Sequence, residues 1–363
     1  MAIRDINEII QYQEFLETQG QNVINILDNF NDLDDIELKN DDLRESIEDI
    51  NCILSESLTN FKTILSHLIE NVEWNSLNVA FFGETNAGKS TLIEALMGGD
   101  GRSIGEGRKD YTKKLSKKIM NDVSLLDMPG IEGNKHQRLH TEIKKAVEQA
   151  HIVFYVVGTN KEPEKGTIKT IKNYLKDRAK VYSVLNVRGK PSRYKYQDSL
   201  LIENNKKTCK RIKQTFEQVL QGQYQGNIAI NAYLGFLARG TAKREIFIKD
   251  QTKVNKYFAD ETKAYEFSNV DQIRKMIIDF KSKAKEEIII SNTNKFIKEM
   301  EKMFSRLLNS KKEFDNTLKE NTKIIKNTKE KANVTVNKYK KRILNLIGIN
   351  IENLKVEMKE IVN

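Results

Sequence analysis

The chain has 363 residues, 39% hydrophobic and 31% charged, with a formal net charge of +10 at pH 7. This length exceeds one comfortable hydrophobic core but is short for three domains. Two cysteines exclude a disulfide-stapled secreted domain, and the N-terminus lacks the basic and then apolar pattern of a signal peptide. No apolar run approaches the roughly 18 residues of a membrane span. We therefore expect a cytoplasmic protein that is soluble or peripheral to the inner face of a membrane.

Residues 1–76 form the first segment and are predicted to be helical, with apolar residues at helical spacing and an acidic break at 31–42. This segment carries 4 lysines and arginines against 17 aspartates and glutamates, whereas the rest of the chain is basic. The split predicts that the acidic segment packs on basic segments, or that the basic surface attracts anionic lipid or nucleic acid. Lysine-rich, solvated helix faces explain the charge equally well.

From residue 77 the pattern changes to short apolar runs separated by helical stretches. The runs predicted as buried strands are 77–82, 122–126, 152–157, 181–185 and 227–230. Alternating strands and helices predict an α/β domain over 77–240, with a mostly parallel sheet and helices on both faces.

The first of these strands runs directly into Gly83-Glu84-Thr85-Asn86-Ala87-Gly88-Lys89-Ser90-Thr91 and then into a predicted helix. This is the GxxxxGK[ST] pattern in its required place, where backbone N–H groups and the helix N-terminus bind phosphates. Lys89 supplies charge to the β- and γ-phosphates, and the Ser90 hydroxyl ligates Mg²⁺. The predicted nucleotide-binding residues here are Gly83, Asn86, Ala87, Gly88, Lys89, Ser90 and Thr91.

The strand at 122–126 ends in Asp127-Met128-Pro129-Gly130, which has the DxxG form of a GTPase switch II. Asp127 is predicted to hold Mg²⁺ through water, and the Gly130 N–H to contact the γ-phosphate. In the charged loop between the two motifs, Thr112 is our choice for the threonine that ligates Mg²⁺ and contacts the γ-phosphate, with Ser103 as the alternative. The next residue, Ile131, stands where small GTPases have a water-orienting glutamine, which predicts slow turnover without a second subunit or partner.

The base-recognition loop is expected after the strand at 181–185, where the sequence is Asn186-Val187-Arg188-Gly189. Asn186 matches the first position of an NKxD motif, but the lysine and the aspartate are replaced by Val187 and Gly189. Loss of a carboxylate that pairs with guanine removes a charge-assisted contact worth about 1.5–3 kcal/mol, so guanine preference is weakened unless Arg188 compensates. Asn231 and Ala232 follow the last strand and are predicted to present backbone to the base.

The remaining residues, 241–363, are predicted to form a C-terminal helical bundle or stalk, because a proline-free amphipathic stripe runs from Ile273 beyond Met303. Together with residues 1–76 and 77–240, this segment makes a three-part organisation. The sequence leaves open whether the chain is truncated at 363.

The layout resembles bacterial dynamin-like GTPases, and most closely the kind named LeoA (labile enterotoxin output). The resemblance rests on residues 104–112 and 185–189, on the DxPG switch II and on the helical flanks. It implies Mg²⁺-dependent GTP hydrolysis to GDP, pairing of identical or related subunits through the GTPase face, and binding or remodelling of an anionic membrane. It also implies that Asn86 takes the place of a catalytic serine that helps to position water.

Three alternatives stay open at this point. The first is a nucleotide-gated scaffold with negligible hydrolysis, and the second is an RNA- or ribosome-associated GTPase, although we expect no nucleic-acid partner. The third is a P-loop ATPase, since Gly189 replaces the guanine-binding aspartate.

Overall fold

The computed structural model describes residues 3–28, 48, 52, 55–63, 65–66, 69–70, 72–105, 115–130, 146–159, 172, 180–324 and 330–362. The chain divides into two compact units. Unit 1 contains residues 1–3 and 73–291, and unit 2 contains residues 4–72 and 292–363. Among the described residues, no helix combines the length and apolar character needed to cross a membrane.

Unit 1 is built on a six-stranded sheet in the order β2-β3-β1-β4-β5-β6. The strands are β1 (Asn78–Gly83), β2 (Ser116–Met120), β3 (Val123–Asp127), β4 (Ile152–Gly158), β5 (Lys180–Asn186) and β6 (Tyr224–Ile230). All neighbouring strands are parallel except β2, which pairs antiparallel with β3 at the edge. The predicted fold class is therefore confirmed, with one added edge strand.

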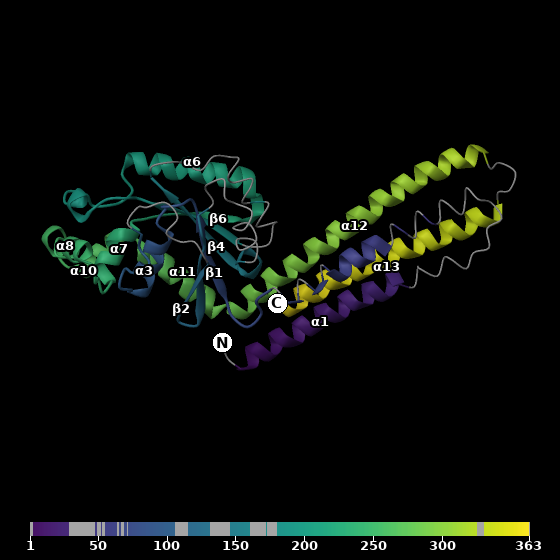
Figure 1. Ribbon diagram of the computed structural model, residues 1–363, viewed down its shortest axis with the longest axis horizontal. Helices are drawn as coiled ribbons and strands as arrows, with labels where there is room; N and C mark the ends of the chain where they lie inside the picture. The colour runs from purple at the N-terminus through teal and green to yellow at the C-terminus, as the bar shows by residue number, and fades with distance from the viewer. Residues whose placement is uncertain are drawn as a thin grey trace. The chain divides into compact units, whose positions relative to one another are not determined.

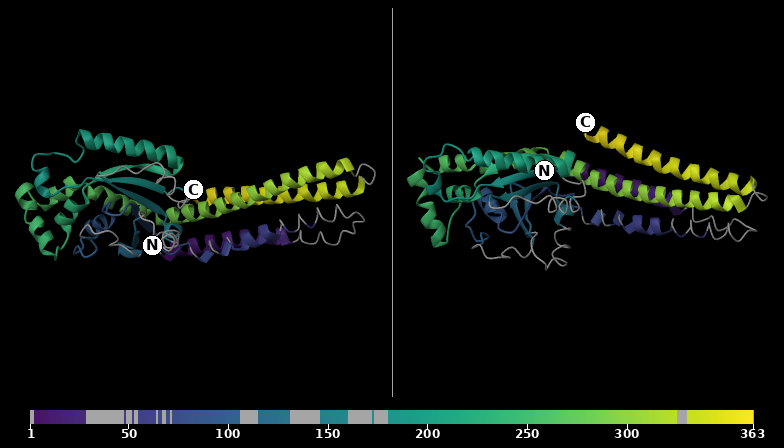
Figure 2. Two further views of the ribbon diagram at one scale, coloured as in Figure 1. Left: turned by 45° about the horizontal axis from the view of Figure 1, so that its top comes forward. Right: turned by 90° about the horizontal axis from the view of Figure 1, so that it is seen from above.

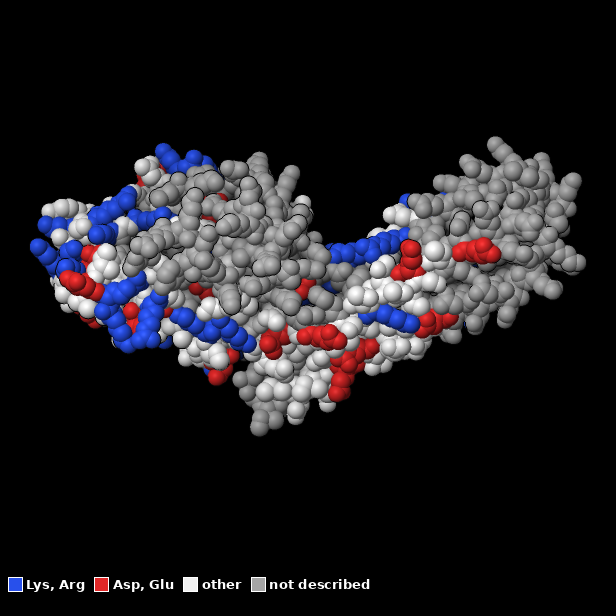
Figure 3. Space-filling view, in the orientation of Figure 1, with Lys and Arg blue, Asp and Glu red and all other residues white. Residues whose placement is uncertain are grey.

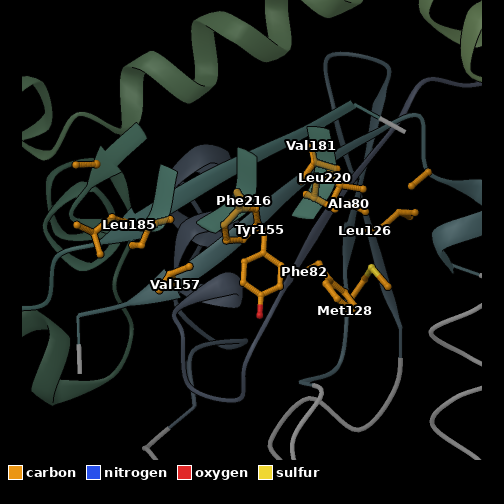
Figure 4. Close-up of a cluster of buried hydrophobic side chains, with 14 of the residues drawn as sticks. Ala80, Phe82, Leu126, Met128, Tyr155, Val157, Val181, Leu185, Phe216 and Leu220 are labelled. Atoms are coloured by element: carbon orange, nitrogen blue, oxygen red, sulfur yellow. The ribbon is translucent and has the colours of Figure 1, made fainter. Parts of the chain in front are cut away.

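Helices cover both faces of this sheet (Figure 1). On one face, Ala80 and Phe82 of β1 join a buried cluster with Phe216 of α6 (Glu203–Leu220). Figure 4 shows Tyr155 of β4 between Phe82 and Phe216, and its ring centroid lies 5.2 Å from that of Phe216. On the other face, Tyr182 contacts Phe280 of α11, with ring centroids 5.9 Å apart. Burial of alternate residues of the same strands on two faces holds the strand ends, where the nucleotide site lies, in register.

The remaining elements of unit 1 are short. They are α3 (Lys89–Met97), η2 (Pro191–Tyr194), η3 (Gln221–Gln223), α7 (Ala232–Arg239), α8 (Glu245–Gln251), α9 (Val254–Tyr257), α10 (Glu261–Ser268) and α11 (Val270–Ser282). The sequence pattern predicts that the nucleotide-binding domain ends at residue 240, whereas unit 1 of the structure continues to Ser291. The reason lies in the buried residues of α10 and α11: Ala264, Val270 and Ile273 are fully buried within unit 1.

Unit 2 is a bundle of long helices, α1 (Ile3–Asp28), α12 (Ala284–Ile324) and α13 (Glu330–Val362), with helical residues between 55 and 70 (Figure 2). The unit boundary, after Ser291, falls inside α12. Gly20 of α1 permits close helix packing, because a Cβ at this position would lie 2.6 Å from Leu65 Cδ1. The bundle core of the described residues includes Ile9, Leu16, Val23, Phe61, Leu65, Phe296, Met300, Ile347 and Leu354.

Candidate functional site

The P-loop between β1 and α3 has a backbone that two glycines make possible. Gly83 has φ +144°, and a Cβ there would lie 2.2 Å from the carbonyl oxygen of Val156. Gly88 has φ +102°, and its Cβ would lie 2.1 Å from Nδ2 of Asn186. Both positions combine a left-handed backbone with contact to another strand or loop, so only glycine fits. The loop therefore passes close to the carboxyl ends of β4 and β5.

Lys89, the first residue of α3, is buried and turned back over this loop. Its Nζ donates hydrogen bonds to the carbonyl oxygens of Gly83, at 3.1 Å, and Glu84, at 2.9 Å. A lysine held by loop carbonyls lies inside the concave face of the loop, where it is available to the phosphates of a bound nucleotide.

Ser90 and Asp127 come from different motifs and meet at the ends of α3 and β3. The Ser90 hydroxyl donates to Asp127 Oδ2 at 2.6 Å. Burial raises the pKa of Asp127 above its ordinary value, against the lowering effects of the Ser90 hydrogen bond and of Lys89. Asp127 Oδ1 is buried and has no hydrogen-bond partner among the described residues.

This donor set fits Mg²⁺. A hydroxyl and a carboxylate beside a phosphate loop supply the hard oxygen ligands that Mg²⁺ prefers, with water and phosphate completing the shell. The ion would also balance the buried charge of Asp127 and give its unsatisfied oxygen a partner.

Gly130 of switch II, which was predicted to contact the γ-phosphate, lies against the P-loop. A Cβ on Gly130 would lie 2.2 Å from Thr85 Oγ1 and 2.7 Å from the Thr85 backbone. The structure thus brings Gly130 next to the loop that binds phosphates. Thr85 was not among the nucleotide-binding residues predicted from the sequence, although its neighbours Asn86 and Ala87 were.

The two residues predicted in the charged loop between the P-loop and switch II, Thr112 and Ser103, have different outcomes. Thr112 lies outside the described residues. Ser103, the alternative, donates its hydroxyl hydrogen to the carboxylate of Glu94, a buried residue of α3 that also pairs with Lys118 Nζ at 2.6 Å. Ser103 is therefore engaged with α3 in this conformation.

The base-recognition loop is tied to the P-loop by two side chains. Asn186 Nδ2 donates to the carbonyl oxygen of Ala87 at 2.8 Å, and the Arg188 guanidinium donates to the carbonyl oxygen of Asn86. Arg188, rather than the residue at the lysine position of NKxD, thus supplies the cation that contacts the phosphate loop. Val187 is buried and belongs to the hydrophobic core.

Asn231 and Ala232 lie beside this loop, but their backbone N–H groups already have partners. Ala232 N–H donates to Asn186 Oδ1 at 3.0 Å, and Asn231 N–H donates to the carbonyl oxygen of Ser268 at 2.8 Å. The Asn231 side chain caps α7 by accepting a hydrogen bond from Leu234 N at 2.8 Å. The predicted contact between the backbone of Asn231 and Ala232 and a base stays a prediction.

Comparison with known protein families matches the part of unit 1 that holds the site. A family model described as 50S ribosome-binding GTPase matches residues 78–187, which include the P-loop, Asp127 and the base-recognition loop. This segment is a P-loop GTPase domain.

Two curated relatives match part of the chain. The chain is 29% identical over 123 residues to the Interferon-gamma-inducible GTPase 10 of Mus musculus, and the matched residues make up 32% of this chain and 29% of the relative. It is 29% identical over 107 residues to the GTPase Era of Mycoplasma genitalium, and the matched residues make up 28% of this chain and 37% of the relative. The chain thus spans about a third of the length of these relatives.

Solved structures of bacterial dynamins are also similar to this chain, with low TM-scores and low sequence identity. One is described as the LeoA bacterial dynamin GTPase from ETEC, with 16% identity, a TM-score of 0.34 and coverage of 85% of this chain and 49% of that one. Another is described as an oligomerised bacterial dynamin pair for long-range sensing and tethering of membranes. It has 13% identity, a TM-score of 0.39 and coverage of 95% of this chain and 63% of that one.

Proposed function

We propose that this chain is a Mg²⁺-dependent GTPase of dynamin-like architecture that couples its nucleotide state to assembly with itself or with a related subunit. The observation that carries the catalytic part is the site itself. Lys89 is buried over the phosphate loop, and the Ser90 hydroxyl lies 2.6 Å from Asp127, whose second oxygen has no partner among the described residues. These are the groups that bind, charge-balance and orient a triphosphate with its metal.

The chain's own residues have separate roles in this proposal. Lys89 neutralises charge on the transferred phosphoryl group, and the P-loop amides hold it in place. Gly130, packed against Thr85, is the backbone contact that senses the γ-phosphate. Ser90 and Asp127 would hold Mg²⁺, which would supply positive charge against the negative charge of the phosphates.

The assembly part of the proposal rests on the sequence resemblance to dynamin-like proteins and on the long helices of unit 2. Residue 131 is Ile where small GTPases use glutamine, so the attacking water needs another donor. A second copy facing the nucleotide, with Asn86 as a local donor, would supply it. Membrane attachment of such an assembly, at the inner face, is part of the same proposal.

Hydrolysis of GTP and ATP with Mg²⁺, at several protein concentrations, tests this function. Lys89→Ala removes the lysine of the phosphate loop. Lys213→Ala, which removes an exposed lysine on α6, is the matched control. We expect GTP turnover per molecule to rise with concentration, to vanish in Lys89→Ala and to persist in Lys213→Ala. Turnover independent of concentration would contradict assembly-stimulated catalysis, and absence of turnover would favour the nucleotide-gated scaffold.

A GTPase associated with RNA or the ribosome is the second candidate, since the matched family description names 50S ribosome binding. Figure 3 shows lysine and arginine side chains over the part of unit 1 that holds α8 and α10, and the exposed Lys243, Lys249 and Lys253 lie in this region. A salt titration of RNA binding separates the candidates: affinity that persists near physiological salt favours this one, and its absence dismisses it.

A further inference from the structure

The loop after β5 lacks the carboxylate that recognises guanine, and the structure shows what occupies its place. Gly189 stands at the aspartate position of the NKxD pattern. A Cβ built on Gly189 would lie 2.5 Å from the hydroxyl oxygen of Tyr194 and 2.9 Å from Cζ of the same ring. The side chain of an aspartate at this position would therefore begin 2.5 Å from the Tyr194 hydroxyl oxygen and would collide with this side chain.

Tyr194 is held in this place by contacts on several sides. Its hydroxyl accepts a hydrogen bond from Asn231 Nδ2 at 2.8 Å and donates one to the carbonyl oxygen of Val187 at 3.5 Å. Tyr194 is 3% exposed, and its ring contacts that of Phe267, with ring centroids 5.4 Å apart. Burial raises the pKa of Tyr194, against the lowering effects of the Asn231 hydrogen bond and of Arg193, so the hydroxyl is neutral at physiological pH.

The rest of the base-recognition loop keeps its attachment to the P-loop. Asn186 still bonds to Ala87, and Arg188 still bonds to Asn86. The loop therefore stays beside the phosphate loop, and it departs from the NKxD pattern at Gly189, the position of the carboxylate that recognises N1 and C2 of guanine.

A hydroxyl and a carboxylate impose different selectivity on this edge. An ionised carboxylate only accepts hydrogen bonds, so it favours the N1–H and 2-amino donors of guanine and repels the 2-oxo group of xanthine. A hydroxyl both donates and accepts, so it accepts from a 2-amino group and donates to a 2-oxo group. Its neutral hydrogen bonds are also roughly half as strong as charge-assisted ones.

We propose that the Tyr194 hydroxyl, oriented by Asn231, replaces the guanine-recognising carboxylate and makes this a purine nucleotide site with low discrimination at C2. The inference rests on the proposed function, because it concerns the base of the same nucleotide. The ligand class follows: guanosine, inosine and xanthosine nucleotides all bind, whereas a carboxylate-containing site rejects the xanthosine form by a factor on the order of 10⁴.

The test is the affinity of the full-length protein for GDP, IDP and XDP in the presence of Mg²⁺, measured by competition with a fluorescent GDP derivative. We expect IDP and XDP to bind within about 30-fold of GDP, since only neutral hydrogen bonds of about threefold to tenfold each are exchanged. A preference for GDP over XDP of more than about 30-fold overturns the inference. Failure to bind GDP at all would instead contradict the proposed function.

Substitutions assign the effect to Tyr194. Tyr194→Phe removes the hydroxyl and keeps the ring, and it is expected to weaken GDP about threefold to tenfold and to bring the ratio of GDP to IDP affinity near 1. Tyr196→Phe is the matched control, because Tyr196 is 86% exposed and lies two residues away. Equal ratios in Tyr194→Phe and wild type would show that the hydroxyl does not contact the base.

A second variant installs the missing group. Gly189→Asp combined with Tyr194→Ala places a carboxylate in the space that Tyr194 leaves, and XDP is expected to become at least about 30-fold weaker relative to GDP. An unchanged XDP ratio in a variant whose thermal unfolding and GDP binding are retained would show that this position does not face the base. If the variant does not fold, the wild-type ratios and Tyr194→Phe still decide the question.

Discussion

Asn186 joins three segments of the nucleotide site, and its removal should cost more than that of a comparable asparagine. Its side chain is buried, donates to the Ala87 carbonyl at 2.8 Å and accepts from Ala232 N at 3.0 Å. In Asn186→Ala both backbone groups lose their partner. Each buried polar group left unsatisfied costs about 1–3 kcal/mol, so the free energy of unfolding should fall by about 2–6 kcal/mol.

Asn227→Ala is the matched control, since Asn227 is partly buried and makes one side-chain hydrogen bond, to the Cys209 carbonyl at 3.0 Å. Its loss should cost about 1 kcal/mol. Urea unfolding of the nucleotide-free protein gives both values, and the sole tryptophan, Trp74, lies in unit 1 and reports on its unfolding. A loss in Asn186→Ala no larger than that in Asn227→Ala would refute the reasoning that Asn186 satisfies two buried backbone groups.

Three further predictions concern the phosphate loop and its neighbours. Asp127→Asn should abolish Mg²⁺-dependent GTP turnover yet raise the free energy of unfolding of the nucleotide-free protein at pH 7, because the pKa of Asp127 is raised by burial. Between the ordinary pKa of 3.8 and the raised pKa, the native state binds a proton that the unfolded state releases, so the stability of the wild type falls as pH rises through this range. The extra free energy of unfolding of the variant should therefore disappear below this pH range, as measured by urea unfolding at several pH values. Gly83→Ala places a Cβ 2.2 Å from the Val156 carbonyl at φ +144° and should lower the melting temperature strongly, whereas Gly222→Ala, with nothing within 4 Å, should leave it nearly unchanged. Arg188→Met removes the donor to the Asn86 carbonyl and should speed GDP dissociation about tenfold or more in a stopped-flow chase, with partial recovery in Arg188→Lys; equal rates in all three proteins would exclude a role for this contact.

The sequence by itself determined the elements whose chemistry is local. The P-loop is recognisable because its glycines, lysine and serine must follow one another between a strand and a helix. Strands β1, β3 and β4 appear as apolar runs because they are buried on both faces, and β5 and β6 because the ends of these strands are buried. The position of Asn186 at the end of β5 follows from the order of parallel strands, whose carboxyl ends meet at one edge of the sheet.

Only the tertiary structure decided the features that depend on residues far apart in the chain. The edge strand β2 (Ser116–Met120) is mostly polar and alternates in exposure, so its pairing with β3, rather than its composition, makes it a strand. The amphipathic stripe beginning at Ile273 is continuous in sequence, but α11 packs in unit 1 while the later part of α12 belongs to unit 2. The replacement of a carboxylate by Tyr194 is visible only in space, because a 3₁₀ turn brings this ring back over Gly189 and Asn231 approaches it from the end of another strand. Hydrophobic and glycine patterns report what each segment requires locally, whereas the partner that satisfies a buried polar group is chosen when the segments meet.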